Sequence, residues 1–225
     1  LTGDAITTGS DNVALGYNSL TSNTIGNSNV AIGKDSMIAN VAADRNVAVG
    51  LGTLQNMTSA TTTDTYNTAV GYAAGTAVTT GVQNVLLGGS AGDSLTSANN
   101  NVAIGYNAMG SEDTGDGSTA VGHSALAAMN YDGYAHNTAI GYHAGKEITS
   151  GIKNTITGGL AGDAITDGTE NTVYGYFALS NEDNGASNTA IGAQALGNQD
   201  GGSNNTAIGR QAGLSVSTGG NNTIL

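Results

Sequence analysis

The sequence predicts an all-β protein, a parallel β-solenoid or β-roll of about thirteen 17-residue coils that forms a single repeat domain over residues 1–225. Three observations predict this fold. A short unit, typified by NTAIGYHAG at residues 137–145, starts thirteen times. Its glycine recurs mostly every 17 residues, with two longer steps of 21 and 19. Inside the unit, β-branched residues alternate with small ones, which is the period of a strand.

The unit has a fixed order, numbered here from its asparagine as position 0. Position 0 is Asn in twelve of thirteen copies, with Ser118 as the exception, position +1 is Val or Thr, and position +2 is Ala in nine copies. Position +3 is mostly Ile, Val or Leu, and position +4 is Gly in all twelve completed copies. Two copies supply the representative structural positions: Asn101, Ala103, Ile104, Gly105, Asn137, Ala139, Ile140 and Gly141.

Each position predicts a local structure. Positions +1 to +3 predict a strand, and the glycine at +4 predicts a corner with positive φ or a close backbone approach. We expect a second short strand after the glycine, and then a turn in the variable stretch rich in Ser, Thr, Asp, Asn and Gly. Coils stacked at about 4.8 Å would give a rod of roughly 60 Å.

The two faces of the predicted strand are both apolar. We expect Val or Thr at +1 and the aliphatic residue at +3 to fill the coil, and Ala at +2 to point outward. A strand that is apolar on both faces is normally buried on both, and alanine permits close approach of another chain. Three chains around one axis are the simplest closed arrangement, so the sequence predicts a homotrimer.

Two further rows run along the coils. The asparagines at position 0 predict an internal ladder in which each side chain bonds the backbone and its equivalent one coil away, although the same row has an alternative reading as a ligand surface. Tyrosines follow the glycine in roughly every second coil, where they would cover a seam between chains or stack on sugar rings. They are Tyr17, Tyr72, Tyr106, Tyr142 and Tyr176.

Composition narrows the classes of partner. The net charge is −12, with five basic residues, which argues against nucleic acid and against an anionic membrane surface. No run of eighteen apolar residues exists, so membrane insertion is not expected. One phenylalanine, no tryptophan and no cysteine suit the thin interior of a solenoid better than a large compact core.

No residue pattern predicts catalysis, a metal or a cofactor. The acidic turns around Glu112 and Glu182 lack the glycine-aspartate nonapeptide of calcium-binding β-rolls and are read as solvated charge. His123, His136 and His143 lie on different coils without a matching acidic spacing, which gives neither a zinc set nor a triad. The Thr row at +1 would suit an ice-binding face, but we expect it to point inward.

Two overlong coils interrupt the regular repeat, at residues 51–66 and 124–136. Binding usually resides in loops that a rigid scaffold carries. The second loop supplies two aromatic rings and a carboxylate, which suit a sugar. The candidate receptor contacts are Tyr131, Asp132, Tyr134 and His136.

The NTAIG and NVAIG motifs resemble the repeats in the head domains of trimeric autotransporter adhesins, and the longer 17-residue form is similar to repeats in phage tail-fibre proteins. The resemblance covers essentially the whole chain and implies a left-handed β-roll with three chains to a fibre. Some of those tail fibres end in a self-cleaving chaperone of the endosialidase type. The chain begins and ends in mid-repeat, so we expect a segment of a longer fibre.

The predicted function is a structural and adhesive segment of a homotrimeric, extracellular fibre without enzymatic activity. A phage tail fibre on the virion, contacting a host cell-surface glycan or protein receptor, is the leading interpretation. The alternative is the head of a bacterial trimeric surface adhesin. An ice-binding solenoid or a glycan-degrading tail spike comes third.

Overall fold

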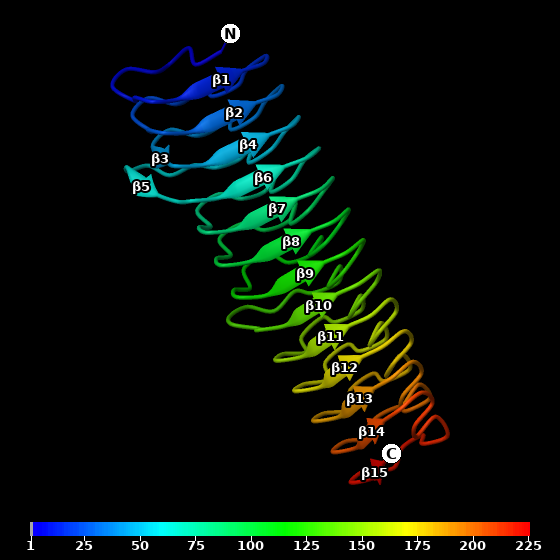
Figure 1. Cartoon of the computed structure of the whole chain (residues 1–225). Helices are drawn as coiled ribbons and strands as arrows, with labels where there is room; N and C mark the ends of the chain where they lie inside the picture. Colours follow the sequence, from blue (N-terminus) through cyan, green and yellow to red (C-terminus); the bar gives the residue numbers. More distant parts are fainter. Residues whose placement is uncertain (1) are drawn as a thin grey trace. The chain divides into compact units, whose positions relative to one another are not determined.

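The computed structural model of the chain is all-β and describes residues 2–225. The chain forms about twelve turns of a parallel β-solenoid, which confirms the predicted fold class. It divides into two compact units, Leu1–Thr114 and Gly115–Leu225, and both are built from the same coil (Figure 1). None of the described residues forms a helix, and so none of them forms a helix long enough to cross a membrane.

The first unit contains eight short strands. They are β1 (Val13–Leu15), β2 (Val30–Ile32), β3 (Ala43–Asp44), β4 (Val47–Val49), β5 (Thr63–Asp64), β6 (Thr68–Val70), β7 (Val85–Leu87) and β8 (Val102–Ile104). Strands β1, β2, β4, β6, β7 and β8 pair in that order in one parallel sheet. Strands β3 and β5 pair separately.

The second unit contains seven strands, one for each unit of the repeat. They are β9 (Thr119–Val121), β10 (Thr138–Ile140), β11 (Thr155–Thr157), β12 (Thr172–Tyr174), β13 (Thr189–Ile191), β14 (Thr206–Ile208) and β15 (Thr223–Ile224). Consecutive strands pair in parallel, and equivalent positions lie opposite each other, as Thr138 lies opposite Thr155. The register of the sheet therefore equals the register of the sequence repeat.

The faces of the strand are the reverse of those predicted. Alanine at +2 points into the coil, where Ala103 and Ala139 are completely buried, while Ile140 at +3 is 42% exposed and Thr138 at +1 is partly exposed. The prediction of an inward +1 and +3 with an outward alanine is thus wrong. A bulky residue in place of Ala139 would disrupt the interior of the coil itself and not a contact with another chain.

The reason is the thin interior, which side chains from the opposite wall also fill. Positions +7, +8 and +11 point inward and are buried in nearly every coil, so +2 is usually small. A small residue at +8 is accompanied by a large one at +11. Where +8 is glycine, as at Gly145, +11 is aliphatic, as at Ile148. A Cβ on Gly145 would lie 2.9 Å from Ile148 Cδ1 and 3.1 Å from Ile156 Cδ1, so this glycine makes room for both side chains.

The second short strand predicted after the glycine is absent from the regular coils of the described chain. The chain there makes turns in which +6, +8 and the residue before each asparagine have positive φ. Non-glycine residues occupy many of these positions, such as Phe177 (φ 55°), Leu179 (φ 49°) and Ser187 (φ 57°). Left-handed residues of this kind turn the chain without glycine, which is why composition did not indicate them.

The glycine corner at +4 is confirmed. All twelve glycines have φ between +129° and +143°. In most of them an added Cβ would collide with the backbone of the next coil, as on Gly175, where it would lie 2.5 Å from the carbonyl oxygen of Gly192. Both the dihedral and the close approach therefore require glycine.

The asparagine ladder is also confirmed within each unit. Asn154 Oδ1 accepts hydrogen bonds from the backbone N–H (3.0 Å) and the side-chain amide (3.1 Å) of Asn171. Asn154 Nδ2 donates to the carbonyl of Gly168, fourteen residues on in the same coil, at 2.8 Å. Asn154 is completely buried, so the ladder satisfies polar groups that water cannot reach.

The exception at Ser118 coincides with an overlong coil. The coil that starts at Ser118 has 19 residues, and the coil that starts at Asn46 has 21. Inserted residues displace the carbonyl that a regular asparagine would bond fourteen residues on. Asn46 Nδ2 donates instead to the Asp44 carbonyl, and Ser118 Oγ accepts the Asn137 N–H at 3.2 Å.

Candidate functional site

An apolar row runs along the outer face of the sheet in each unit. In the first unit it comprises the +3 side chains Leu15, Ile32, Val49, Val70, Leu87 and Ile104. In the second unit it comprises Val121, Ile140, Tyr174, Ile191 and Ile208, interrupted by Thr157. The side chains range from half-buried to 65% exposed at Leu15. The row of the first unit is a continuous apolar strip, and Thr157 divides that of the second unit.

Tyrosines at +5 flank this row. Tyr17, Tyr72 and Tyr106 in the first unit and Tyr142 and Tyr176 in the second are all more than half exposed. Their exposed rings offer further apolar surface, and their hydroxyls can reach water. The geometry of a single chain is compatible with both uses expected from the sequence, a seam between chains and a platform for sugars.

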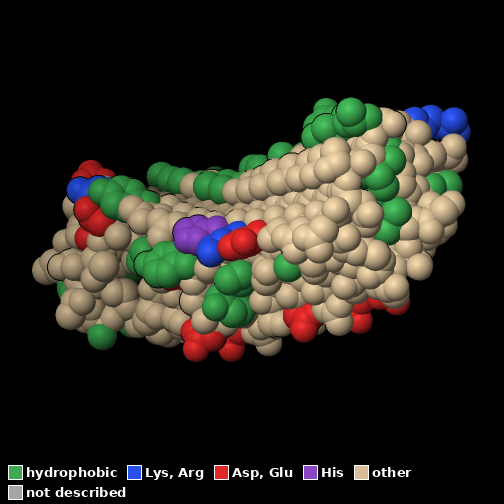
Figure 2. All heavy atoms as spheres, turned by 90° about the horizontal axis from the view of Figure 1, so that it is seen from below, with side chains coloured by type: hydrophobic (Ala, Val, Ile, Leu, Met, Phe, Trp, Pro, Cys, Tyr) green, Lys and Arg blue, Asp and Glu red, His purple; other side chains and the backbone are tan. Residues whose placement is uncertain are grey.

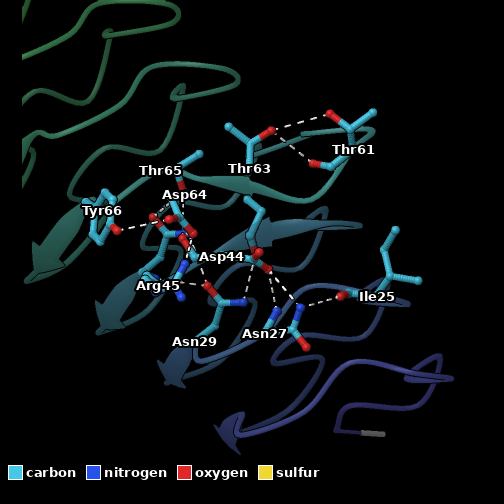
Figure 3. A network of polar contacts seen from close by, with 12 residues as sticks. Ile25, Asn27, Asn29, Asp44, Arg45, Thr61, Thr63, Asp64, Thr65 and Tyr66 are labelled. Carbon is cyan, nitrogen blue, oxygen red and sulfur yellow. Dashed lines mark hydrogen bonds and ion pairs between the residues drawn. The ribbon is translucent and has the colours of Figure 1, made fainter.

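The first overlong coil, residues 51–66, is fastened to the coil before it (Figure 3). Arg45 forms an ion pair with Asp64 and lies 5.9 Å from the ring centroid of Tyr66, whose hydroxyl donates to Asp64 Oδ2 at 3.0 Å. The buried Asp44 Oδ1 accepts the Asn27 N–H at 2.6 Å. These polar groups satisfy one another, so the network anchors an exposed loop.

The second overlong coil carries the candidate receptor contacts. Tyr134 and His136 are exposed and stacked, with ring centroids 5.6 Å apart and 16° between their planes. Asp132 is exposed, whereas Tyr131 is half-buried beside Gly133. A parallel bridge between Asp116 and Tyr134 fixes the loop to the preceding turn. The structure thus brings together two of the four candidates as one aromatic pair.

The structure also groups residues that the sequence reading kept apart. His123 lies 5.4 Å from both Tyr142 and His143 between ring centroids, and Tyr142 stacks on His143 at 3.9 Å. Burial, with Lys146 and His123 adding to it, lowers the pKa of His143. Figure 2 shows histidine side chains beside basic and acidic ones on the surface. The sequence contains a signal for this group, because His123 and Tyr142 share position +5 of adjacent coils.

These groups do not converge on a metal. Among residues 2–225, no three His, Asp or Glu side chains are placed to hold one ion. His136 belongs to the other cluster with Tyr134. Glu182 is completely buried, and its carboxylate accepts hydrogen bonds from the Gly185 N–H (2.6 Å), the Gly201 N–H (2.7 Å) and the Gln199 amide (2.7 Å). This carboxylate, which the sequence reading placed on the surface, is instead a structural part of the core.

Asp163 carries a partly buried carboxyl whose Oδ1 has no hydrogen-bond partner among the described residues. Burial raises its pKa above the ordinary 3.8, although its own backbone N–H and Lys146 oppose the rise. A raised pKa means that the folded state holds the proton more tightly. This carboxyl therefore lowers stability as the pH rises through the interval between 3.8 and the folded-state pKa.

We expect Asp163→Asn to raise the melting temperature at pH 7 by about 1–3 °C. The amide removes an ionised group from a partly desolvated position, and the gain should shrink toward zero near pH 3, where the carboxyl is neutral in both states. Thermal unfolding at both pH values measures the effect. The control is Asp167→Asn, which alters an exposed carboxylate nearby. An equal gain at both pH values would contradict this account.

The threonine row at +1 is exposed to solvent, contrary to the expectation that it points inward. Thr155, Thr172 and Thr223 are exposed, and the other threonines at +1 of the second unit are partly exposed. The expected inward direction of the threonines, which argued against an ice-binding face, is therefore wrong. An ice-binding face must be flat, however, and the neighbouring +3 row is not, because Tyr174 is 61% exposed between smaller side chains.

Comparison with protein-family models, with curated proteins and with solved structures finds no match.

Proposed function

We propose that this chain is a structural and adhesive segment of a homotrimeric extracellular fibre, most simply a phage tail fibre, that has no enzymatic activity. The head of a bacterial trimeric surface adhesin is the alternative. The observation that carries the proposal is the outward apolar row at +3, which now takes the place of the alanine face as the surface for association. The resemblance of the NTAIG motif to the repeats of trimeric adhesins supports three chains in each fibre.

The spacing of the row supports a second copy as its partner. Its side chains recur once per coil, at the distance between paired strands. A surface that matches this spacing along many coils must itself repeat at that spacing, and another copy of the chain does so. Three copies around one axis would bury all three rows at the centre and leave the exposed carboxylates of the turns, such as Asp113 and Asp183, in water.

The fibre would contact its target where the repeat is interrupted, because regular coils offer the same surface at every level. We propose the pair Tyr134 and His136, with Asp132 and Tyr131 beside it, as a contact for a host cell-surface glycan or protein. Threefold symmetry would present three such loops at one height, so weak contacts would add.

The assembly is tested with the double variant Ile140→Asp, Ile191→Asp. The intact segment is expected to have the mass of a trimer in light scattering, about 66 kDa from three chains of 22.1 kDa. The variant is expected to fall to monomer with unchanged circular dichroism, because two buried charges per chain cannot be accommodated at the axis.

The control is Ser150→Asp, Ser217→Asp, which adds the same charge at exposed turns and should leave the trimer intact. A monodisperse monomer from the intact segment at micromolar concentration contradicts the proposal. A dimer would contradict its threefold part.

Ice binding is the second candidate function, because the threonine row points outward, although the protruding Tyr174 breaks the flatness of that face. Thermal hysteresis by the purified segment, lost on replacing Thr155 and Thr172 by Lys, would support it against the fibre.

A further inference from the structure

We propose that the second unit holds a shallow binding pocket for a single neutral saccharide ring. The pocket lies on the turn side of three successive coils, has a volume of about 240 Å³, and is lined by Phe177, Leu214 and five small or amide-bearing residues. It lies outside the loop of Tyr131 to His136 and does not depend on assembly into a fibre.

Small residues at a variable position of the coil help to form this pocket. Position +9 carries a larger side chain in several coils, such as Gln55, Thr76 and Lys146, but it is Ser180 and then Gly197 in two successive coils here. Leu214 occupies +9 in the third coil and closes one side. Two small residues beside a large one leave a depression between the coils.

The chain's only phenylalanine also lines the pocket. Phe177 occupies position +6 with a φ of 55°, and the ring of Tyr176 stands at 85° to it with centroids 4.5 Å apart. The edge-to-face contact holds the phenylalanine ring at the rim. A partly exposed aromatic ring beside a depression offers an apolar surface to the C–H groups of a sugar.

Neutral amides complete the lining. Asn181 Nδ2 donates to Asn198 Oδ1 at 3.3 Å, and Gln211 Nε2 donates to Gln194 Oε1 at 2.9 Å. These bonds orient the amides and leave Asn181 Oδ1, Asn198 Nδ2 and Gln194 Nε2 without a partner among the described residues. The pocket therefore offers both acceptors and donors, which is what sugar hydroxyls require.

The charge of the lining selects the class of ligand. No ionisable side chain lines the pocket, and the chain carries a net charge of −12. An anionic sugar would find no cation there and would meet an unfavourable field. The volume lies below the range typical of sites for drug-sized ligands, so one ring fits better than an oligosaccharide.

Saturation-transfer NMR on the intact segment tests the proposal with methyl glycosides of glucose, galactose, mannose and N-acetylglucosamine, and with sialic acid as the anionic comparison. At least one neutral glycoside is expected to receive saturation from the aromatic protons. The variant Gly197→Thr should fill the pocket and weaken binding at least about tenfold. Threonine occupies +9 naturally at Thr21 and Thr76, and Gly197 lacks a positive φ. Its added Cβ would lie 3.2 Å from the Gln194 carbonyl oxygen and from Leu214 Cδ1, so circular dichroism must first show that the variant folds.

Phe177→Ala should lose the transfer as well, and alanine occurs naturally at +6 at Ala73. Ser150→Ala, at an exposed turn outside the pocket, is the control and should leave this binding unchanged. No transfer to any neutral glycoside, undiminished binding by Gly197→Thr, or preference for sialic acid would each overturn the proposal. A monomeric segment that still binds the sugar would refute the fibre alone.

Discussion

Gly141→Ala is expected to lower the free energy of unfolding by about 3 kcal/mol or more. Gly141 has a φ of +143°, and an added Cβ would collide with the carbonyl of Gly158 in the next coil. The colliding atom is backbone, so relief would require separation of two paired coils. Urea denaturation monitored by circular dichroism measures the loss.

The matched control is Gly209→Ala. Gly209 has a similar φ of +129°, but the nearest atom to its added Cβ is Ala212 Cβ at 3.9 Å. It should therefore show only the cost of the dihedral, about 1–2 kcal/mol. Amide hydrogen exchange in the coil around each glycine separates these local losses from fraying of the terminal coils. If both variants lose the same stability, the close approach between coils has no energetic weight.

Asn154→Ala is expected to cost about 2–4 kcal/mol, the second-largest effect. The change leaves the buried N–H of Asn171 and the carbonyl of Gly168 without their partners. Each buried polar group left unpaired costs about 1–3 kcal/mol. Thermal and urea unfolding measure the change.

Two further variants test whether the lost hydrogen bonds cause this loss of stability. Asn130→Ala removes an exposed asparagine and should change stability by less than about 0.5 kcal/mol. Asn154→Asp keeps the acceptor for Asn171 but cannot donate to Gly168 when ionised, so it should recover stability only as the pH falls. A loss below about 1 kcal/mol in Asn154→Ala would show that water replaces the ladder.

The repeat was sufficient to predict the fold class, the strand at +1 to +3, the glycine corner and the ladder. Each depends on one residue type that recurs at one position, and only a single conformation explains such recurrence. Asn137 and Gly141 illustrate this, since the bonds of the first and the dihedral of the second follow from their chemistry alone.

The direction of the strand faces could not be predicted in the same way. A three-residue strand with Thr138, Ala139 and Ile140 is apolar on both sides, and volume decides which side is interior. The space left inside the coil is set by Gly145 and Ile148 on the opposite wall. The pairing of a small residue at +8 with a large one at +11 is visible in the sequence only when the two positions are compared. The left-handed turn at Phe177 carried no signal, because phenylalanine is not a residue that favours positive φ.

The saccharide pocket escaped sequence reading for a related reason. Ser180 and Gly197 are unremarkable residues in a variable stretch, and they matter only because stacking places them side by side. Tyr134 and His136, in contrast, are candidates from the sequence alone, because they lie in an inserted stretch.

The ladder has a direction that bears on how the protein is made. In each unit the bonds of a new asparagine go to the one about 17 residues earlier, as from Asn171 to Asn154 and from Asn188 to Asn171. A ribosome adds 17 residues in about 1–3 s, so each coil would emerge onto a finished one that already presents its acceptors. Vectorial synthesis can therefore lay down the stack coil by coil, with no long-range search.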